Sequence, residues 1–146
     1  MMKNLLLILC FFPMLALAQE EDQSKYMVGA VPEVNGKVVF SQEINAPNLS
    51  KDQIFDAILA WANTRFKTDK GNWGMVAYSN KEEGQIACYG NEYIVFADKT
   101  FSLDRAKINY RMNFVCTSGK CNVEVTNITY LYPEDSRERL AAEEWI

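Results

Sequence analysis

The sequence predicts an α+β domain in which one antiparallel sheet carries helices packed on one face. Three observations lead to this prediction. A capped amphipathic segment follows a strand-like run, several alternating runs follow it, and a charged segment with helical spacing closes the chain. Helices at the two ends with meandering strands between them are typical of α+β folds.

The first eighteen residues are predicted to be a signal peptide. Lys3 precedes a short apolar run, and Ala16-Leu17-Ala18 has the small-x-small pattern of a cleavage site. The run is shorter than the roughly 20 apolar residues that a membrane span needs. We therefore expect cleavage between Ala18 and Gln19, a secreted or periplasmic protein of the cell envelope, and no integral membrane segment after cleavage.

The mature chain is expected to begin with a flexible tether. Residues 19–35 mix acidic residues with glycine and proline and show little apolar periodicity. Residues 36–146 are then long enough for a single domain with its own core. Within it, the run 37–44 is strand-like, and Asn45-Ala46-Pro47-Asn48 ends it.

The clearest local signal is a helix from about 51 to 66. Ser50 and Gln53 form a capping box, in which Ser50 caps the first turn and Gln53 reaches back to the backbone. Apolar residues then recur at spacings of three and four: Ile54, Phe55, Ile58, Trp61, Ala62 and Phe66. This stripe needs a partner surface, which the strands supply.

The remaining chain reads mostly as strands. Runs are expected at 72–78, 85–88, 93–96 and 106–116, and another begins at Cys121. Gly90-Asn91 suggests a bulge or tight bend, and 99–104 a connecting loop. Between 106 and 116 the apolar residues share one face, whereas Asn109, Arg111 and Asn113 share a wet one. The parity changes near Asn127, which suggests a second bulge, and 134–146 has helical spacing.

Two cysteines flank the turn between the last two strands. Thr117 to Lys120 is expected to be a four-residue hairpin loop with Gly119 at positive φ, which places Cys116 opposite Cys121. Because disulfides persist in oxidising compartments, we predict a Cys116–Cys121 disulfide and a buried, free Cys88. A link from Cys88 to either hairpin cysteine remains an alternative, since sequence alone does not determine connectivity.

The run KVVFSQEINAPNLSKDQIFDAILAWANTRF resembles the opening of a secreted Bacteroidetes family of domains of unknown function with a TBP-like fold. The meander AKINYRMNFVCTSGKCNVEVTNITYLYP and the closing AAEEWI are also similar, so the resemblance covers roughly 37–146. It implies a β-α-β(4)-α domain and carries no active site. The chain stops at Trp145-Ile146, where similar chains tend to run on, so the last helix is expected to be short or truncated.

Charge limits the partners of the protein. The chain carries 15 basic and 19 acidic residues, a net charge of −4, and loss of Lys3 with the signal peptide makes it more negative by one unit. Nucleic-acid binders gain most of their affinity from basic contacts to phosphate, and the basic residues here are scattered singly. We therefore expect no nucleic-acid partner, although the namesake of the fold binds DNA.

The sequence contains no recognisable catalytic or cofactor motif. It has no histidine, so neither a Ser-His-Asp nor a Cys-His arrangement can form. Three cysteines without histidine fit zinc poorly, and no EF-hand or glycine-rich phosphate loop occurs. We expect no catalytic residue, no metal and no cofactor. The pairs Glu82-Glu83 and Glu143-Glu144 remain candidates, but adjacent residues do not face one another.

Three functions remain open. The first is a small non-catalytic binding or accessory module whose unknown partner is an envelope protein, peptide or glycan. The second is a carboxylate-dependent hydrolase or transferase, and the third is an inhibitor or immunity-type protein. An exposed apolar patch on the sheet would favour binding, whereas a deep pocket with acidic groups of raised pKa would favour an enzyme. Aromatic residues that could stack a sugar or peptide on the outer face are Trp73, Tyr78, Tyr89 and Tyr93.

Overall fold

The computed structural model describes residues 27, 29–69, 71–99, 102–133 and 135–144. The expected signal peptide, with its cleavage site between Ala18 and Gln19, lies outside these residues. The chain divides into two compact units, Met1–Ala30 and Val31–Ile146. In the first, the Ala30 backbone N–H donates to the Met27 carbonyl at 2.9 Å. The architecture that follows is that of the second unit.

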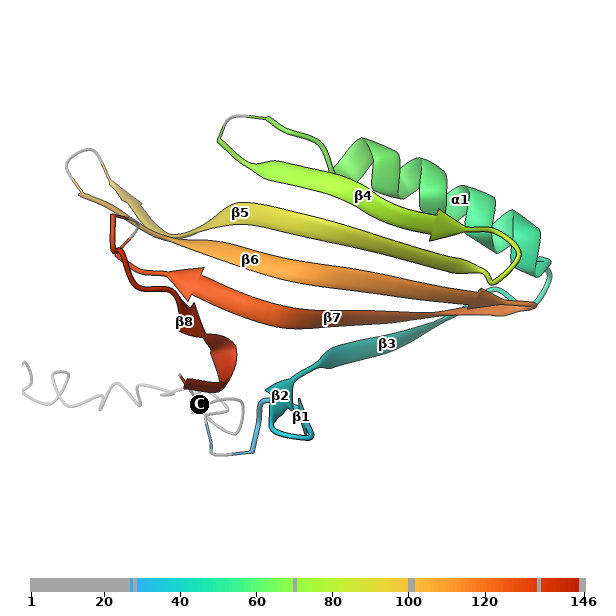
Figure 1. The fold of residues 1–146 in the computed structure, drawn as a ribbon, viewed down its shortest axis with the longest axis horizontal. Helices are drawn as coiled ribbons and strands as arrows, with labels where there is room; N and C mark the ends of the chain where they lie inside the picture. The colour runs from blue at the N-terminus through green and yellow to red at the C-terminus, as the bar shows by residue number, and fades with distance from the viewer. Residues whose placement is uncertain (1–26, 28, 70, 100–101, 134, 145–146) are drawn as a thin grey trace, which may run out of the picture. The chain divides into compact units, whose positions relative to one another are not determined.

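A six-stranded antiparallel sheet forms the centre of this unit (Figure 1). Its strands are β3 (Phe40–Asn45), β4 (Trp73–Asn80), β5 (Gln85–Lys99), β6 (Ser102–Thr117), β7 (Lys120–Leu131) and β8 (Leu140–Ala141). The order across the sheet is β3-β7-β6-β5-β4, and β8 also pairs with β7. Two short strands, β1 (Glu33–Val34) and β2 (Lys37–Val38), pair with each other. From β3 to β7 the chain follows the expected sequence of a strand, a helix and four strands, and β1, β2 and β8 are additional. Strand β1 falls within the stretch expected to be a tether.

The predicted helix is confirmed as α1, Lys51–Arg65. The Gln53 backbone N–H donates to Ser50 Oγ at 3.3 Å, and the Ser50 N–H donates to Gln53 Oε1 at 2.9 Å, so both halves of the capping box form. The helix packs its apolar stripe against one face of the sheet. From that stripe Ile54, Phe55, Ala62 and Phe66 are buried, whereas Trp61 remains 46% exposed.

Strand β5 differs from the expectation of two short strands. It runs without interruption from Gln85 to Lys99, and the pairing with β6 continues through Gly90 and Asn91. Glycine is required at position 90 for packing and not for a bend, because the ring of Tyr110 occupies the space that a side chain on Gly90 would need. The irregularity in β5 falls later, between Val95 and Ala97. The loop expected at 99–104 is also shorter, because β6 already begins at Ser102.

The hairpin between β6 and β7 confirms one part of its prediction and corrects another. Cys116 pairs with Cys121, and Gly119 has a φ of +82°. Thr117 and Lys120 are themselves paired, so the loop has two residues instead of four. Further along, the pairing shifts between Asn109 and Arg111, and Asn127 has a φ of +52°. The bulge expected near Asn127 is therefore present.

Within its described residues, 135–144, the C-terminal segment does not form the α-helix expected over 134–146. In its described part, β8 is followed by a single 3-10 turn, η2 (Ala142–Glu144). The backbone N–H of Ala141 donates to Glu144 Oε2 at 2.8 Å, and that of Val38 donates to Glu143 Oε1 at 3.0 Å. The Glu143 contact connects the segment to β2, and the pairing of β8 with β7 connects it to the sheet. Ala142 then packs with Val38 and Ile128 in a small second core.

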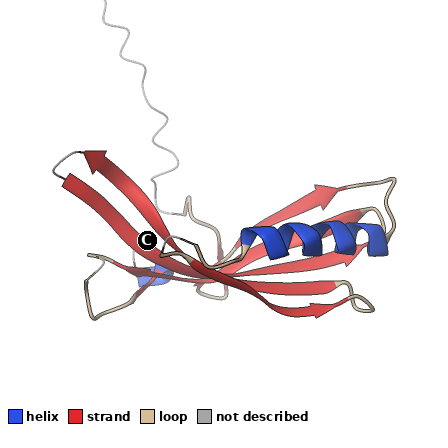
Figure 2. Cartoon of the chain, turned by 90° about the horizontal axis from the view of Figure 1, so that it is seen from above, coloured by secondary structure: helices blue, strands red, loops and turns tan. Residues whose placement is uncertain are grey.

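The main core lies between α1 and the sheet. It combines the buried helix residues with inward-facing residues of three strands: Ile86, Cys88, Phe114, Cys116 and Cys121. In both ribbon views α1 covers one end of the sheet only, and the far end of the β5–β6 hairpin extends beyond it (Figures 1 and 2). Within the described ranges, no helix is long and apolar enough to cross a membrane.

Candidate functional site

The face of the sheet opposite α1 carries a row of large exposed side chains on β4 and β5. Side chains alternate between the two faces of a strand, so Ile86 and Cys88 point to the helix and Tyr89 points away from it. Met75 pairs with Tyr89 across the two strands. The row consists of Trp73, Met75, Tyr78 and Tyr89, which are 46%, 42%, 45% and 41% exposed.

Three of the four aromatic residues proposed from the sequence thus belong to this row. The fourth, Tyr93, is half-buried further along β5, where the guanidinium carbon of Arg105 lies 4.1 Å from its ring centroid and Lys107 Nζ lies 5.0 Å from it. Tyr93 is therefore already covered by cations of β6. The exposed row is the part of the set that remains open to a ligand.

A pocket of about 380 Å³ opens beside this row, and we call it the open-face pocket. Its lining comes from β4 to β7 and from the segment before β8: Trp73, Tyr89, Gly90, Asn109, Tyr110, Arg111, Asn127, Thr129 and Arg139. Asn109 pairs with both Asn91 and Thr129, which places the pocket over the middle strand of the sheet. Its volume falls in the range typical of small-molecule sites.

Asn109 is a polar residue at the centre of the open-face pocket lining. Asn109 Oδ1 accepts a hydrogen bond from Asn91 Nδ2, and this bond orients the Asn109 amide. The Asn109 Nδ2 atom is then buried with no partner among the described residues. A buried unsatisfied donor is rare in native proteins and calls for a specific explanation.

Two arginines give the pocket a positive charge. The Nε of Arg111 donates to Asn113 Oδ1 at 2.9 Å, which holds the guanidinium carbon 5.8 Å from the Tyr89 ring centroid. Arg139 is exposed and also belongs to the lining. Neither arginine forms an ion pair in the part of the chain that the structure describes, and no Asp or Glu lines the pocket.

The sequence pointed to part of this site. The alternation of 106–116 placed Asn109 and Arg111 on the wet face of β6, and aromatic composition marked Trp73 and Tyr89. The contribution of Arg139 could not be foreseen, because it depends on how the C-terminal segment crosses beside β7. The bulge at Asn127 was a visible signal, but its position in a pocket was not.

A second group of titratable residues lies on the helix side of the sheet. Arg65 Nη2 donates to Glu92 Oε2 at 2.7 Å, and the Tyr110 hydroxyl donates to Glu92 Oε1 at 2.6 Å. The Arg65 hydrogen bond is the main reason that the pKa of Glu92 lies below its ordinary value, although burial acts in the opposite direction. Each carboxylate oxygen accepts one hydrogen bond, so this group connects α1 to β5 and β6, and Glu92 does not line the open-face pocket.

In the two carboxylate pairs proposed from the sequence, the carboxylates of Glu83, Glu143 and Glu144 accept hydrogen bonds. Glu83 lies in the β4–β5 turn and accepts from the Tyr78 hydroxyl at 3.3 Å, while the backbone carbonyl of Glu82 accepts from Lys51 Nζ at 2.8 Å. Glu143 and Glu144 accept backbone N–H groups, as described above. Hydrogen bonds from the backbone lower the pKa of Glu143. The structure does not bring either pair into the open-face pocket.

The three described cysteines are buried in the helix–sheet core. The sulfurs of Cys116 and Cys121 lie 3.3 Å apart. Burial raises the pKa of Cys88 to about 11 and that of Cys116 to about 12. A buried thiol of raised pKa, such as that of Cys88, is a poor nucleophile at neutral pH. The prediction that Cys88 is buried is confirmed, since its side chain is not exposed. The disulfide between Cys116 and Cys121 stays a prediction.

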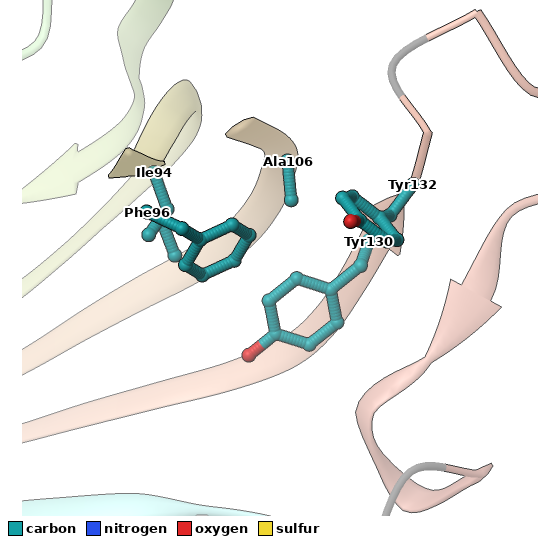
Figure 3. Close-up of a pocket in the computed structure, with 5 residues that line it drawn as sticks. All are labelled: Ile94, Phe96, Ala106, Tyr130 and Tyr132. Atoms are coloured by element: carbon teal, nitrogen blue, oxygen red, sulfur yellow. The ribbon is translucent and has the colours of Figure 1, made fainter. Parts of the chain in front are cut away.

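An apolar hollow of about 450 Å³ lies on the helix side of the sheet, near the far end of the β5–β6 hairpin. Figure 3 shows the side chains that surround it: Ile94, Phe96, Ala106, Tyr130 and Tyr132. Phe96 and Tyr132 meet edge to face, with ring centroids 6.1 Å apart. No charged side chain lines the hollow, so it can receive an apolar group but offers little to orient a polar one. Among the described residues, no cluster of three metal-ligating side chains occurs.

Comparison with known proteins identifies relatives of this fold. Residues 40–131 match the model of a domain of unknown function (DUF4468) with TBP-like fold. A DUF4468 family protein of known crystal structure from Bacteroides ovatus is 40% identical, with a TM-score of 0.75 over 86% of this chain and 72% of that one. A TBP-like protein from Parabacteroides distasonis is 31% identical, with a TM-score of 0.66 over 78% of this chain and 71% of that one.

No curated protein matches the chain. The family model covers more than half of the sequence, and the resemblance noted from the run 37–66 and the later meander is confirmed by it. The six-stranded antiparallel sheet with α1 on one face agrees with the TBP-like description. The chain belongs to the family of domains of unknown function (DUF4468) with a TBP-like fold.

Proposed function

We propose that this domain is a small non-catalytic binding module of the cell envelope, which holds a protein, peptide or glycan on the open face of β4 and β5. The observation that carries the proposal is the row of Trp73, Met75, Tyr78 and Tyr89, four adjacent large side chains with more than 40% exposure. Scattered exposed apolar residues are ordinary, whereas a contiguous set is typical of an interaction surface.

The acidic residues support binding over catalysis. A carboxylate-dependent hydrolase or transferase needs an acid of raised pKa at a pocket. In this protein the pKa values of Glu92 and Glu143 are instead lowered by their hydrogen-bond donors. An inhibitor or immunity-type protein is the other alternative. It would also act by binding, and its partner would be an enzyme.

The envelope location rests on the sequence. The apolar run and the Ala16-Leu17-Ala18 pattern favour export, and mass analysis of secreted protein should find Gln19 as the first residue. Retention of residues 1–18 in the exported product would contradict this part of the proposal. The scattered basic residues and the net negative charge argue against a nucleic-acid partner.

Binding arrays test the proposal directly. The full mature chain is applied to a glycan array and to a peptide array, beside Trp73→Ala and Tyr89→Ala variants. A Leu103→Ala variant is the control, because Leu103 is 55% exposed on the β5–β6 hairpin but does not belong to the row. We expect a ligand whose binding falls at least about tenfold in both row variants and is unchanged in the control. A ligand whose binding is unchanged in both the Trp73→Ala and Tyr89→Ala variants would refute the proposal.

A further inference from the structure

We infer that the open-face pocket binds an acidic saccharide, whose carboxylate is held by Arg111 and Arg139. The inference deepens the proposed function and rests on it. It selects glycans from the three classes of partner, and within them sugars that carry a uronic-acid carboxylate.

The charge of the pocket is the first reason. The protein as a whole is acidic, with a net charge of −4, yet this pocket is lined by two arginines and no carboxylate. Hydrogen bonding from Arg111 Nε to Asn113 leaves its two terminal nitrogens for a ligand. Planar guanidinium groups bind carboxylates through paired hydrogen bonds, so a carboxylate is a suitable anion for this site.

The unpartnered amide of Asn109 is the second reason. Its oxygen is occupied by Asn91, so its buried Nδ2 can only donate. A ligand that reaches this atom must present an oxygen acceptor. Sugar hydroxyl, ring and carboxylate oxygens all meet that need, and Thr129 and Asn127 provide further polar groups in the same lining.

The aromatic residues are the third reason, and they separate a saccharide from a peptide. Trp73 and Tyr89 are partly exposed aromatic residues in the lining, and the C–H face of a pyranose can pack on such rings beside the Arg111 guanidinium. No aliphatic side chain lines the pocket. Rings combined with amide and guanidinium groups suit a ligand with one apolar face and many oxygens, as a saccharide has. The volume of about 380 Å³ corresponds to a ligand of one or two sugar rings.

Titration calorimetry with uronic-acid disaccharides provides the test. Each disaccharide is compared with its carboxyl-reduced neutral counterpart, which keeps the ring geometry and lacks the charge. We expect the acidic form to bind at least about tenfold more tightly, and Arg111→Gln or Arg139→Gln to remove most of that preference. Asn109→Asp should also weaken binding, because it replaces the donor with a repelling charge.

Matched controls are available on the same surface. Arg137→Gln removes an exposed arginine two residues from Arg139, and Asn122→Asp adds the same charge on β7 outside the pocket lining; both should keep the affinity of the unmodified protein. Melting curves of each variant exclude unfolding as the cause of a loss. Equal binding of the neutral sugars, or binding of acidic peptides in place of sugars, would overturn the inference. The proposed function would survive that result if Trp73→Ala and Tyr89→Ala still reduced binding, and it would fail with the inference if they did not.

Discussion

The β5–β6 hairpin is covered at one end and open at the other. In the covered half, residues 85–92 and 108–116, Ile86 and Phe114 face each other under α1 and are 1% and 3% exposed. In the far half, residues 94–99 and 102–106, Ile94 and Phe96 surround the apolar hollow and are 37% and 60% exposed. Ile86 and Ile94 share one face of the same strand, so the difference arises from what packs on that face.

Length explains why α1 covers only one half. The helix and strand β5 each contain 15 residues. A helix rises about 1.5 Å per residue, which gives roughly 22 Å. A strand advances about 3.3 Å per residue, which gives roughly 50 Å. One helix therefore spans less than half of the strand. The alternation of side chains selects a face, and a second element decides whether that face is buried.

The largest expected effect comes from the covered half. Phe114→Ala removes a buried ring that lies 5.9 Å from the Trp61 ring, and it should lower the free energy of unfolding by about 3–5 kcal/mol. Urea unfolding followed by circular dichroism measures this. A loss below about 1 kcal/mol would show that α1 does not depend on this contact.

The predicted disulfide belongs to the same half. Formation of the Cys116–Cys121 bond should raise the free energy of unfolding by about 2 kcal/mol relative to the reduced protein, since it closes a short loop. Urea unfolding with and without reductant measures the difference. The control is Cys88→Ala, which should retain it. Peptide mapping that finds Cys88 in the crosslink would contradict the predicted pairing.

The Arg65–Glu92–Tyr110 group makes the stability of the covered half depend on pH. Because the pKa of Glu92 is lower in the folded protein than its ordinary value, its contribution is complete above the unfolded pKa, about 4.3, and is lost as the pH falls through the folded pKa. Glu92→Gln should therefore cost about 1–2 kcal/mol at pH 7 and little at the acid end of that window.

A matched variant separates this effect from a general charge effect. Glu43 accepts from Lys120 at 2.7 Å in a pair whose side chains are 44% and 45% exposed. Glu43→Gln should change stability by less than about 0.5 kcal/mol at pH 7, because exposed ion pairs contribute little. Equal losses in the two variants, or a Glu92→Gln loss that persists in acid, would contradict the role assigned to the group.

Capping of α1 has a smaller expected effect. Ser50→Ala removes the acceptor of the Gln53 N–H, and it should lower the free energy of unfolding by about 1 kcal/mol. Ser79→Ala, an exposed serine on β4, is the control and should have almost no effect. If the two variants melt alike, the first turn of α1 does not need its cap.

The same comparison shows what the sequence could predict. Four features could be predicted because each depends on residues that are close in the chain. They are the capping box, the apolar stripe of the helix, the alternation of the strands and the bulge at Asn127. The bulge or bend predicted at Gly90 was wrong, because glycine is needed there to make room for the ring of Tyr110 on the neighbouring strand. The prediction of a C-terminal α-helix was also wrong, because the spacing of residues does not show that Glu143 and Glu144 accept hydrogen bonds from backbone N–H groups.

Only part of the candidate site could be predicted from the sequence. Aromatic and asparagine residues on the outer face follow from strand parity, so the existence of a mixed surface there could be foreseen. The open-face pocket could not be predicted, because Arg139 belongs to a segment whose path depends on long-range contacts with β2 and β7. Pairing register and the path of a terminal segment depend on tertiary packing, which one sequence does not specify.

The smallest expected effect lies in the far half and completes the comparison. Phe96 is 60% exposed and keeps one edge contact, with Tyr132. Phe96→Ala should therefore lower the free energy of unfolding by less than about 1 kcal/mol, several times less than Phe114→Ala on the paired strand. Both variants are measured by urea unfolding under one set of conditions, so that the difference between them is the quantity tested. Similar losses would mean that the far half is covered in solution, and that the hollow seen in Figure 3 is filled by another part of the protein or by a second molecule.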